Sequence, residues 1–146
     1  MALVEAPTLH GNAGSPQLGL GLDAIEGTVG WTLRGDQAAA AWGAPLPLQG
    51  DSPPDFYLPD DRTLRIARQL CGEAHTYANR GATVTVAPTR WVVAHRFDLS
   101  KRRPERGIMW PAPHPVVAAL DLARSGARGR AILEDFDPPP GFHRVW

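Results

Sequence analysis

The chain has 146 residues, a length typical of one domain. Its 15 basic and 15 acidic side chains cancel and 43% of its residues are hydrophobic, which excludes both a polycation and a disordered charged tail. Fifteen glycines and fifteen prolines make up about a fifth of the chain. That share excludes a long helical bundle and predicts short elements joined by many turns.

The sequence predicts neither a membrane span nor a cofactor. No apolar run approaches the roughly 20 residues that a spanning helix needs, and the first ten residues lack the regions of a signal peptide. We therefore expect a cytoplasmic protein with no membrane contact. Cys71 is the only cysteine, so a disulfide within the chain and a zinc site with several thiolates are excluded. The five histidines form no ligand pair.

The chain opens on a glycine-rich lead-in, residues 1–28, in which no apolar stripe is long enough for a stable helix. A single domain over residues 29–146 is expected to follow. β-branched, aromatic and alternating runs, many of them flanked by proline, predict its strands. These are residues 29–33, 46–48, 56–58, 82–86 and 91–95. We expect 46–48 and 56–58 at an edge of the sheet, or at least flanked by proline, and the last two runs as an antiparallel pair.

Helices are predicted where a capping residue precedes an apolar stripe and glycine follows it. The expected helices are 35–43 with Asp36 as cap, a helix from Asp60 or Asp61 to Gly72, one opened by His114-Pro115 and ending near 125–126, and 128–136. In the third, Val116, Val117, Leu120 and Ala123 are expected to be buried. Residues 99–107 are expected to form a polar loop. The order of elements predicts an α+β fold, a mixed and mostly antiparallel sheet with helices on one face.

Four aspartates, Asp51, Asp55, Asp60 and Asp61, lie within eleven residues around the strand at 56–58. Carboxylates beside a strand are what a divalent-cation site in a nucleotidyltransferase requires. Tyr57, however, stands where the second carboxylate of an Asp-x-Asp pair would be. The ordinary alternative, which we favour, is that Asp60 and Asp61 cap a helix and that Asp51 and Asp55 are turn residues.

A basic segment, residues 90–106, carries six basic and two acidic side chains with two aromatic residues between them. Such a segment can bind nucleic acid or an acidic protein partner, or it can be a solvated connection. The positions expected to contact a partner are Arg96, Lys101, Arg102, Arg103 and Arg106.

Three parts of the chain together resemble the C-terminal domain of AbiEi-like antitoxins of type IV toxin–antitoxin systems. They are WTLRGDQAAAAWG (31–43), PDFYLP (54–59), and HPVVAALDLA (114–123) with RGRAILE (128–134). The resemblance implies a bacterial regulator in two parts: a winged helix that binds the operator, and this domain, which neutralises a nucleotidyltransferase toxin. The chain departs from that pattern because the residues before Trp31 are too few for a winged helix.

Three functional hypotheses follow from these observations. The first is a non-enzymatic antitoxin-like interaction domain with a cognate toxin as its partner and no catalytic residues. The second is a divergent Mg²⁺-dependent nucleotidyltransferase that uses Asp55 with one of Asp51, Asp60 or Asp61. The third is a nucleic-acid binder that uses the basic segment.

Overall fold

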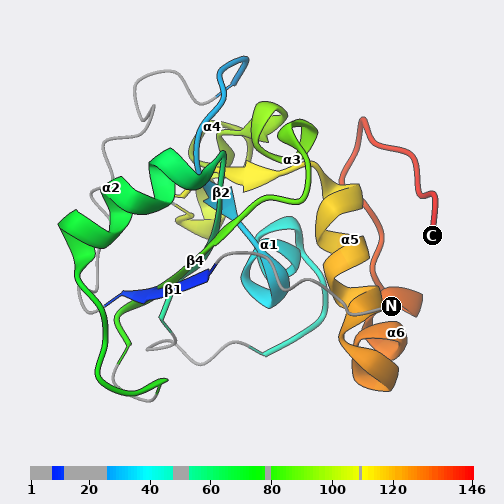
Figure 1. Ribbon diagram of the computed structural model, residues 1–146. Coiled ribbons are helices and arrows are strands. Elements are labelled where there is room, and N and C mark those ends of the chain that lie inside the picture. The colour runs from blue at the N-terminus through cyan, green and yellow to red at the C-terminus, as the bar shows by residue number, and fades with distance from the viewer. Residues whose placement is uncertain (1–7, 12–25, 48–52, 78–79, 109) are drawn as a thin grey trace.

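The structure is a computed structural model that describes residues 8–11, 26–47, 53–77, 80–108 and 110–146. It has an α+β fold, as the sequence predicts (Figure 1). The main sheet contains β1 (Thr8–Gly11), β2 (Thr32–Leu33), β3 (Asp55–Leu58) and β4 (Ala82–Val86), and a smaller sheet contains β5 (Arg96–Phe97) and β6 (Ala112–Pro113). The helices are α1 (Gly35–Trp42), α2 (Asp61–Cys71), α3 (Arg90–Ala94), α4 (Leu99–Arg102), the 3-10 helix η2 (Pro104–Arg106), α5 (Pro115–Arg124) and α6 (Gly126–Glu134).

The main sheet is mixed and mostly antiparallel, with the strand order β1-β4-β3-β2. β3 and β4 are parallel and are joined through α2, whereas β1 pairs with β4 and β2 with β3 in the antiparallel sense. Residues 56–58 do not form an edge strand, because β3 lies between β4 and β2, but the flanking by proline that the sequence predicts as the alternative is confirmed. Pro54 and Pro59 flank the strand from outside, so every residue of β3 keeps the backbone N–H that a central strand needs.

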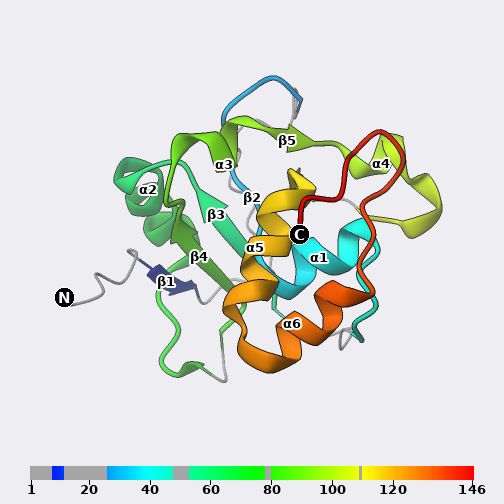
Figure 2. The same cartoon turned by 90° about the vertical axis from the view of Figure 1, so that its right-hand side faces the viewer.

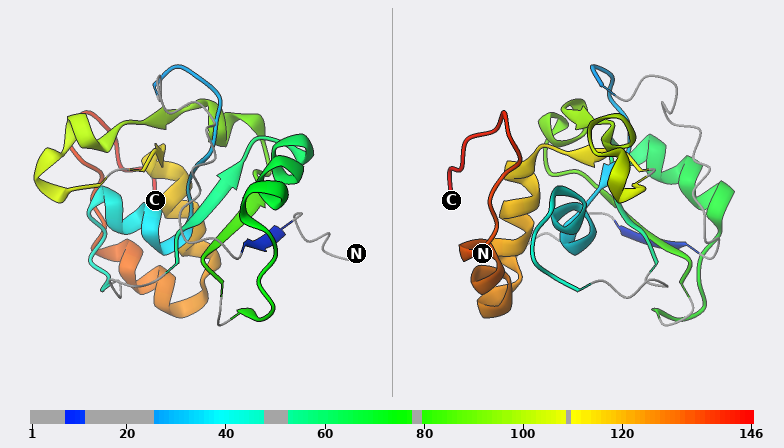
Figure 3. Two further views of the ribbon diagram at one scale, coloured as in Figure 1. Left: turned by 90° about the vertical axis from the view of Figure 1, so that its left-hand side faces the viewer. Right: turned by 180° about the vertical axis from the view of Figure 1, so that it is seen from behind.

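The helices pack on both the sheet and one another. α2 packs on β1 and β4, and α1, α5 and α6 form a group that lies on the other side of these strands (Figures 1 and 3). The core between them is aromatic: Trp31 lies edge-on against Phe56, with ring centroids 4.6 Å apart, and the Trp42 indole N–H donates to the Pro113 carbonyl at 2.7 Å. Among the helices of the described residues, none is long and apolar enough to span a membrane.

The apolar run at residues 91–95 forms a helix, α3, and not the strand that the sequence predicts. Short apolar runs do not distinguish the two by periodicity. Here Val92 and Val93 are buried while Trp91 is 45% exposed, which is the pattern of one helical turn on the core. The partner of β4 is consequently not this run but β3 and β1.

The lead-in contributes to the fold, although most of it lies outside the described residues. Thr8–Gly11 forms β1 at the edge of the main sheet. Glu26 and Thr28 accept hydrogen bonds from arginines of the basic segment. Residues 48–52, which include the end of the strand predicted at 46–48, are likewise not described, and Leu46 itself lies outside any strand.

The helix boundaries are close to those predicted, and Val117 is buried as predicted, but the rest of the buried face of α5 differs from the prediction. Leu120 is 59% exposed and Ala123 is also exposed, whereas Ala118, Ala119 and Leu122 are buried. Alanine therefore contributes more to the core side of α5 than its low hydrophobicity suggests. Small side chains let α5 approach α1 closely, and this close approach selects the alanine face. Residues 99–107 form α4 and η2 in place of a polar loop.

His114 caps α5 with its own ring, because its Nδ1 accepts from the Val116 N–H at 3.1 Å. The ring also contacts Trp91, Phe97 and Phe142. Burial in this cluster, and to a lesser degree nearby His95, lowers the pKa of His114. The folded state therefore favours the neutral ring that can accept the hydrogen bond.

Acidification should weaken this cap. Because the pKa of His114 is lower in the folded chain than in the unfolded chain, its stabilising effect is complete above about pH 6.5 and is lost as pH falls below that value. Between pH 8 and pH 5 we expect the wild type to lose about 0.5–1 kcal/mol more unfolding free energy than His114→Asn, which caps without titrating. Denaturant unfolding at both pH values measures the difference. Equal losses in the two proteins would contradict this role of His114.

Candidate functional site

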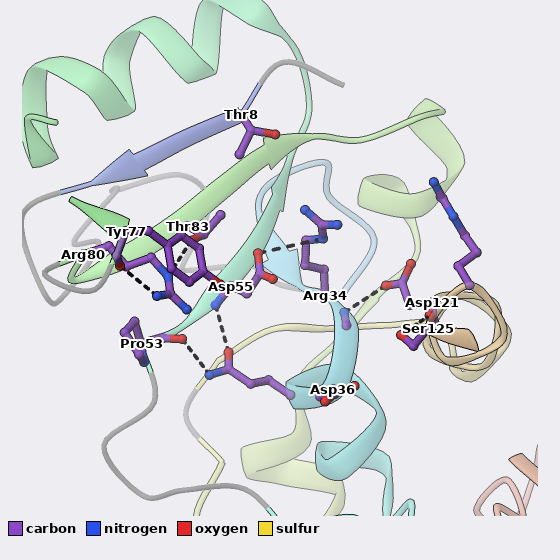
Figure 4. Close-up of a pocket in the computed structure, with 13 residues that line it drawn as sticks. Thr8, Arg34, Asp36, Pro53, Asp55, Tyr77, Arg80, Thr83, Asp121 and Ser125 are labelled. Atoms are coloured by element: carbon purple, nitrogen blue, oxygen red, sulfur yellow. Dashed lines mark hydrogen bonds and ion pairs between the residues drawn. The ribbon is translucent and has the colours of Figure 1, made fainter. Parts of the chain in front are cut away.

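A pocket of about 620 Å³ lies between the N-terminus of α1, the first residue of β3 and the last turn of α5. Its lining is mostly charged and polar: Thr8, Arg34, Gly35, Asp36, Gln37, Pro53, Asp55, Tyr77, Arg80, Thr83, Asp121, Arg124 and Ser125. Asp55 and Arg34 face each other in the middle of the pocket, with Arg80 and Tyr77 to one side and Asp121 and Ser125 to the other (Figure 4). Its size is that of a small-molecule site.

Gln37 and the backbone fix Asp55 firmly in place. The Asp55 N–H donates to Gln37 Oε1 at 2.8 Å, Gln37 Nε2 donates to the Pro53 carbonyl at 2.9 Å, and the Arg34 N–H donates to the Asp55 carbonyl at 3.0 Å. The start of β3 is thereby tied to the start of α1. The Asp55 side chain takes its direction from this rigid frame.

The Asp55 carboxylate is poorly solvated and incompletely paired. Its Oδ1 is buried without a hydrogen bond, although the side chain as a whole is 37% exposed, so its other oxygen faces the pocket. Arg34 Nε lies 3.8 Å from Oδ1, which is an ion-pair distance but too long for a hydrogen bond, and this nitrogen is also unbonded. Burial raises the pKa of Asp55 to about 6 against the opposing pull of Arg34.

Asp121 joins α5 to the two other walls of the pocket, β3 and the N-terminus of α1. One carboxylate oxygen accepts from the Tyr57 hydroxyl at 2.6 Å, and the other accepts from the Gly35 N–H at 2.9 Å. The second bond caps α1 from another helix, whereas the sequence predicts Asp36 for this task. Burial and the charge of Asp121 raise the pKa of Tyr57, so the phenol remains a donor.

Arginines supply the positive side of the pocket. Arg34 donates to Thr85 Oγ1 at 2.6 Å and lies over the Tyr57 ring, while Arg80 lies 3.6 Å from the centre of the Tyr77 ring and donates to Thr83. Arg124 belongs to the lining as well. Asp36 is paired with Arg128 of α6.

The structure separates the predicted acidic cluster. Asp60 caps α2 by accepting from the Thr63 N–H, and Asp61 is exposed in the first turn of that helix, so both lie beyond the other end of β3 from Asp55. Asp51 is outside the described residues. Within the part of the chain that is described, no three side chains of the metal-binding types lie together. The favoured alternative for Asp60 holds, whereas Asp55 is a strand residue and not a turn residue.

The sequence predicts Arg96 on a contact surface, but the structure buries it. Its side chain is 2% exposed and donates to the Thr28 and Trp31 carbonyls and to Thr28 Oγ1. A guanidinium can satisfy several carbonyls at once because its donors point in different directions. Arg96 therefore links the smaller sheet to the chain before β2, which makes a partner contact through its side chain a wrong expectation.

The other basic residues that the sequence assigns to a partner contact are closer to the surface, but all four have intramolecular partners. Arg102 forms two hydrogen bonds with Glu26. Arg103 and Arg106 donate to the Trp42 and Ala40 carbonyls at the C-terminus of α1. Lys101 is 84% exposed and pairs only loosely with Asp98, at 3.6 Å. Lys101 is consequently the best placed of the group to contact a partner.

These contacts change the expected cost of mutating the basic segment. From the sequence, converting Arg102, Arg103 and Arg106 to glutamate should leave Tm nearly unchanged. The structure predicts a loss of about 1–2 kcal/mol, because the variant removes hydrogen bonds from the end of α1 and places negative charge at the negative end of the helix dipole. Lys101→Glu should cost less than about 0.5 kcal/mol. Thermal unfolding of both variants tests this, and equal Tm values for the two would contradict the role in capping α1.

The three parts of the chain that carry the family resemblance meet at the pocket. Arg34 and Gln37 come from residues 31–43, Asp55 from 54–59, and Asp121 from 114–123. Figure 2 shows α1, α5 and α6 side by side next to β2 and β3. No family model, curated protein or solved structure matches the chain significantly. The sequence analysis does not identify Arg34 and Asp121 as site residues, although both lie in the segments that carry the resemblance.

Proposed function

We propose that the chain is a non-enzymatic interaction domain of the AbiEi-like antitoxin type, whose partner is a nucleotidyltransferase toxin. The observation that carries the proposal is the convergence of the three resembling segments. Residues far apart in the chain, Arg34, Asp55 and Asp121, share one pocket, and hydrogen bonds from Asp121 and Gln37 tie its walls together.

The partner contact is assigned to the exposed side of the basic segment, with Lys101 and Arg102 at its centre. Lys101 extends from α4 into solvent, and the Arg102 side chain is 43% exposed beside it. Charges of this kind speed encounter with an acidic surface and set specificity, even where they add little net affinity. The rest of the segment, Arg96 above all, maintains the shape of that surface.

Growth of cells that express the toxin tests the proposal. The nucleotidyltransferase encoded beside this gene should arrest growth, and co-expression of the chain should restore it. Lys101→Glu should weaken the rescue while the protein folds normally, and Arg65→Glu, an exposed change on α2, should rescue like the wild type. Absence of such a neighbouring gene, or arrest that the chain does not relieve, would overturn the proposal.

A divergent nucleotidyltransferase is a second candidate, favoured by the partly open carboxylate of Asp55 in a pocket that also contains Asp121. Among the described residues, the second carboxylate under this candidate comes from Asp121 of α5 and not from Asp60 or Asp61, which lie beyond the other end of β3. Calorimetry with each nucleoside triphosphate and magnesium decides it. Heat of binding that depends on magnesium and is lost in Asp121→Asn would support it, and absence of heat for all four would exclude it.

A further inference from the structure

Both a hydrogen-bond acceptor and a hydrogen-bond donor at the pocket lack a partner among the described residues. Asp55 offers carboxylate oxygens that accept no hydrogen bond from the described residues, and one of them faces the pocket. The unbonded Nε of Arg34 is buried beside Asp55 Oδ1, and Arg80 stands to one side of both. The Asp55 oxygen that faces the pocket is therefore an acceptor that the donors of a ligand can satisfy.

These charges exclude the simplest ligands. An apolar molecule would cover the Asp55 carboxylate and the Arg34 guanidinium without satisfying either of them. A plain anion would meet the negative charges of Asp55 and Asp121, and a plain cation would meet Arg34, Arg80 and Arg124. A ligand with hydrogen-bond donors in its middle and negative charge at one end matches both Asp55 and Arg80.

We propose that this pocket binds a phosphorylated sugar, either free or as the ribose phosphate of a nucleotide, whose hydroxyls donate to Asp55 and whose phosphate is held by Arg80. Sugar hydroxyls are natural donors to a carboxylate, and guanidinium groups match phosphate oxygens. Tyr77, which is 63% exposed beneath Arg80, adds an aromatic surface at the same end. The proposal requires no metal and does not rest on the antitoxin assignment.

Titration calorimetry on the full chain, in buffer with a chelator, tests the proposal with ribose 5-phosphate, adenosine 5′-monophosphate, ribose and inorganic phosphate. At least one of the two phosphorylated sugars should bind about tenfold or more tightly than ribose or phosphate alone. Equal binding of both would assign the site to the sugar phosphate itself. Binding of the nucleotide alone would assign it to a nucleotide, with the base on the Tyr77 side.

Variants connect that binding to the pocket. Asp55→Asn and Arg80→Gln should each weaken it about tenfold or more, because each removes a charged partner of the ligand. Asp61→Asn and Arg65→Gln, the same changes on exposed α2 positions, should leave the affinity unchanged. The proposal is overturned if neither phosphorylated sugar binds, if inorganic phosphate binds equally well, or if the α2 variants lose as much as the pocket variants. None of these outcomes depends on toxin rescue.

Discussion

Replacing Asp55 with asparagine should raise the free energy of unfolding by about 1 kcal/mol at pH 8, a value that allows for the partly exposed side chain. Burial opposes the charged form of Asp55 more strongly than Arg34 favours it, which raises its pKa to about 6. The folded chain thus pays a cost for an ionised Asp55 at neutral pH. Residues whose ionised form costs stability are concentrated in functional sites, which is why Asp55 is central to the proposed ligand site.

The stability difference between the wild type and Asp55→Asn should depend on pH. Because the pKa of Asp55 is raised in the folded chain, the wild type gains stability as pH falls through about 6. The advantage of Asp55→Asn should therefore be largest above pH 6 and should vanish near pH 4. Chemical denaturation of both proteins across this range measures it, with Asp61→Asn as the exposed control. A variant that is less stable than the wild type at pH 8 would show that the ion pair with Arg34 outweighs desolvation.

Gly129→Ala should destabilise the chain by about 3 kcal/mol or more, the largest loss that we expect from a single methyl group. A Cβ at this position would lie 1.8 Å from the Leu122 carbonyl oxygen and 2.9 Å from Ser125 Cβ. The obstacle is the backbone of α5, which no side-chain rotation can relieve. α6 can pack on α5 only because residue 129 has no side chain.

The same change should disturb the pocket, since α5 carries Asp121 to the cap of α1. Thermal unfolding measures the loss of stability, and the amide resonance of Gly35 reports whether the Asp121 bond survives. Arg130→Ala, on the exposed side of α6, should change stability by less than about 0.5 kcal/mol. If Gly129→Ala has the same Tm as Arg130→Ala, then α6 does not pack on α5 as closely as described.

Local signals in the sequence predict part of this fold. Gly43 ends α1, Asp60 begins α2 and Pro115 begins α5. These bounds are predictable because capping and helix termination depend on neighbouring residues. The pairing of strands could not be predicted in this way. β4 pairs with β3 across a helical crossover and with β1 from the glycine-rich lead-in, and both choices depend on packing between distant segments.

The pocket was harder to predict than the fold. In the sequence Asp55 stands out because other aspartates lie nearby, yet its partners are Arg34, which precedes α1, and Gln37 within α1. Arg96 shows the opposite error. Its place in a basic segment predicts exposure, but its guanidinium bonds three groups of the preceding chain and is buried. The density of charge along the sequence does not show which basic side chains are buried and bonded to other parts of the same chain.

The most direct test of the antitoxin proposal is calorimetric titration of the purified chain with the nucleotidyltransferase encoded beside its gene. We expect a one-to-one complex with a Kd on the order of a micromolar or tighter, with affinity that falls as salt is raised and in Lys101→Glu. Absence of heat at concentrations on the order of 100 micromolar, with both proteins folded, would contradict the proposed partnership.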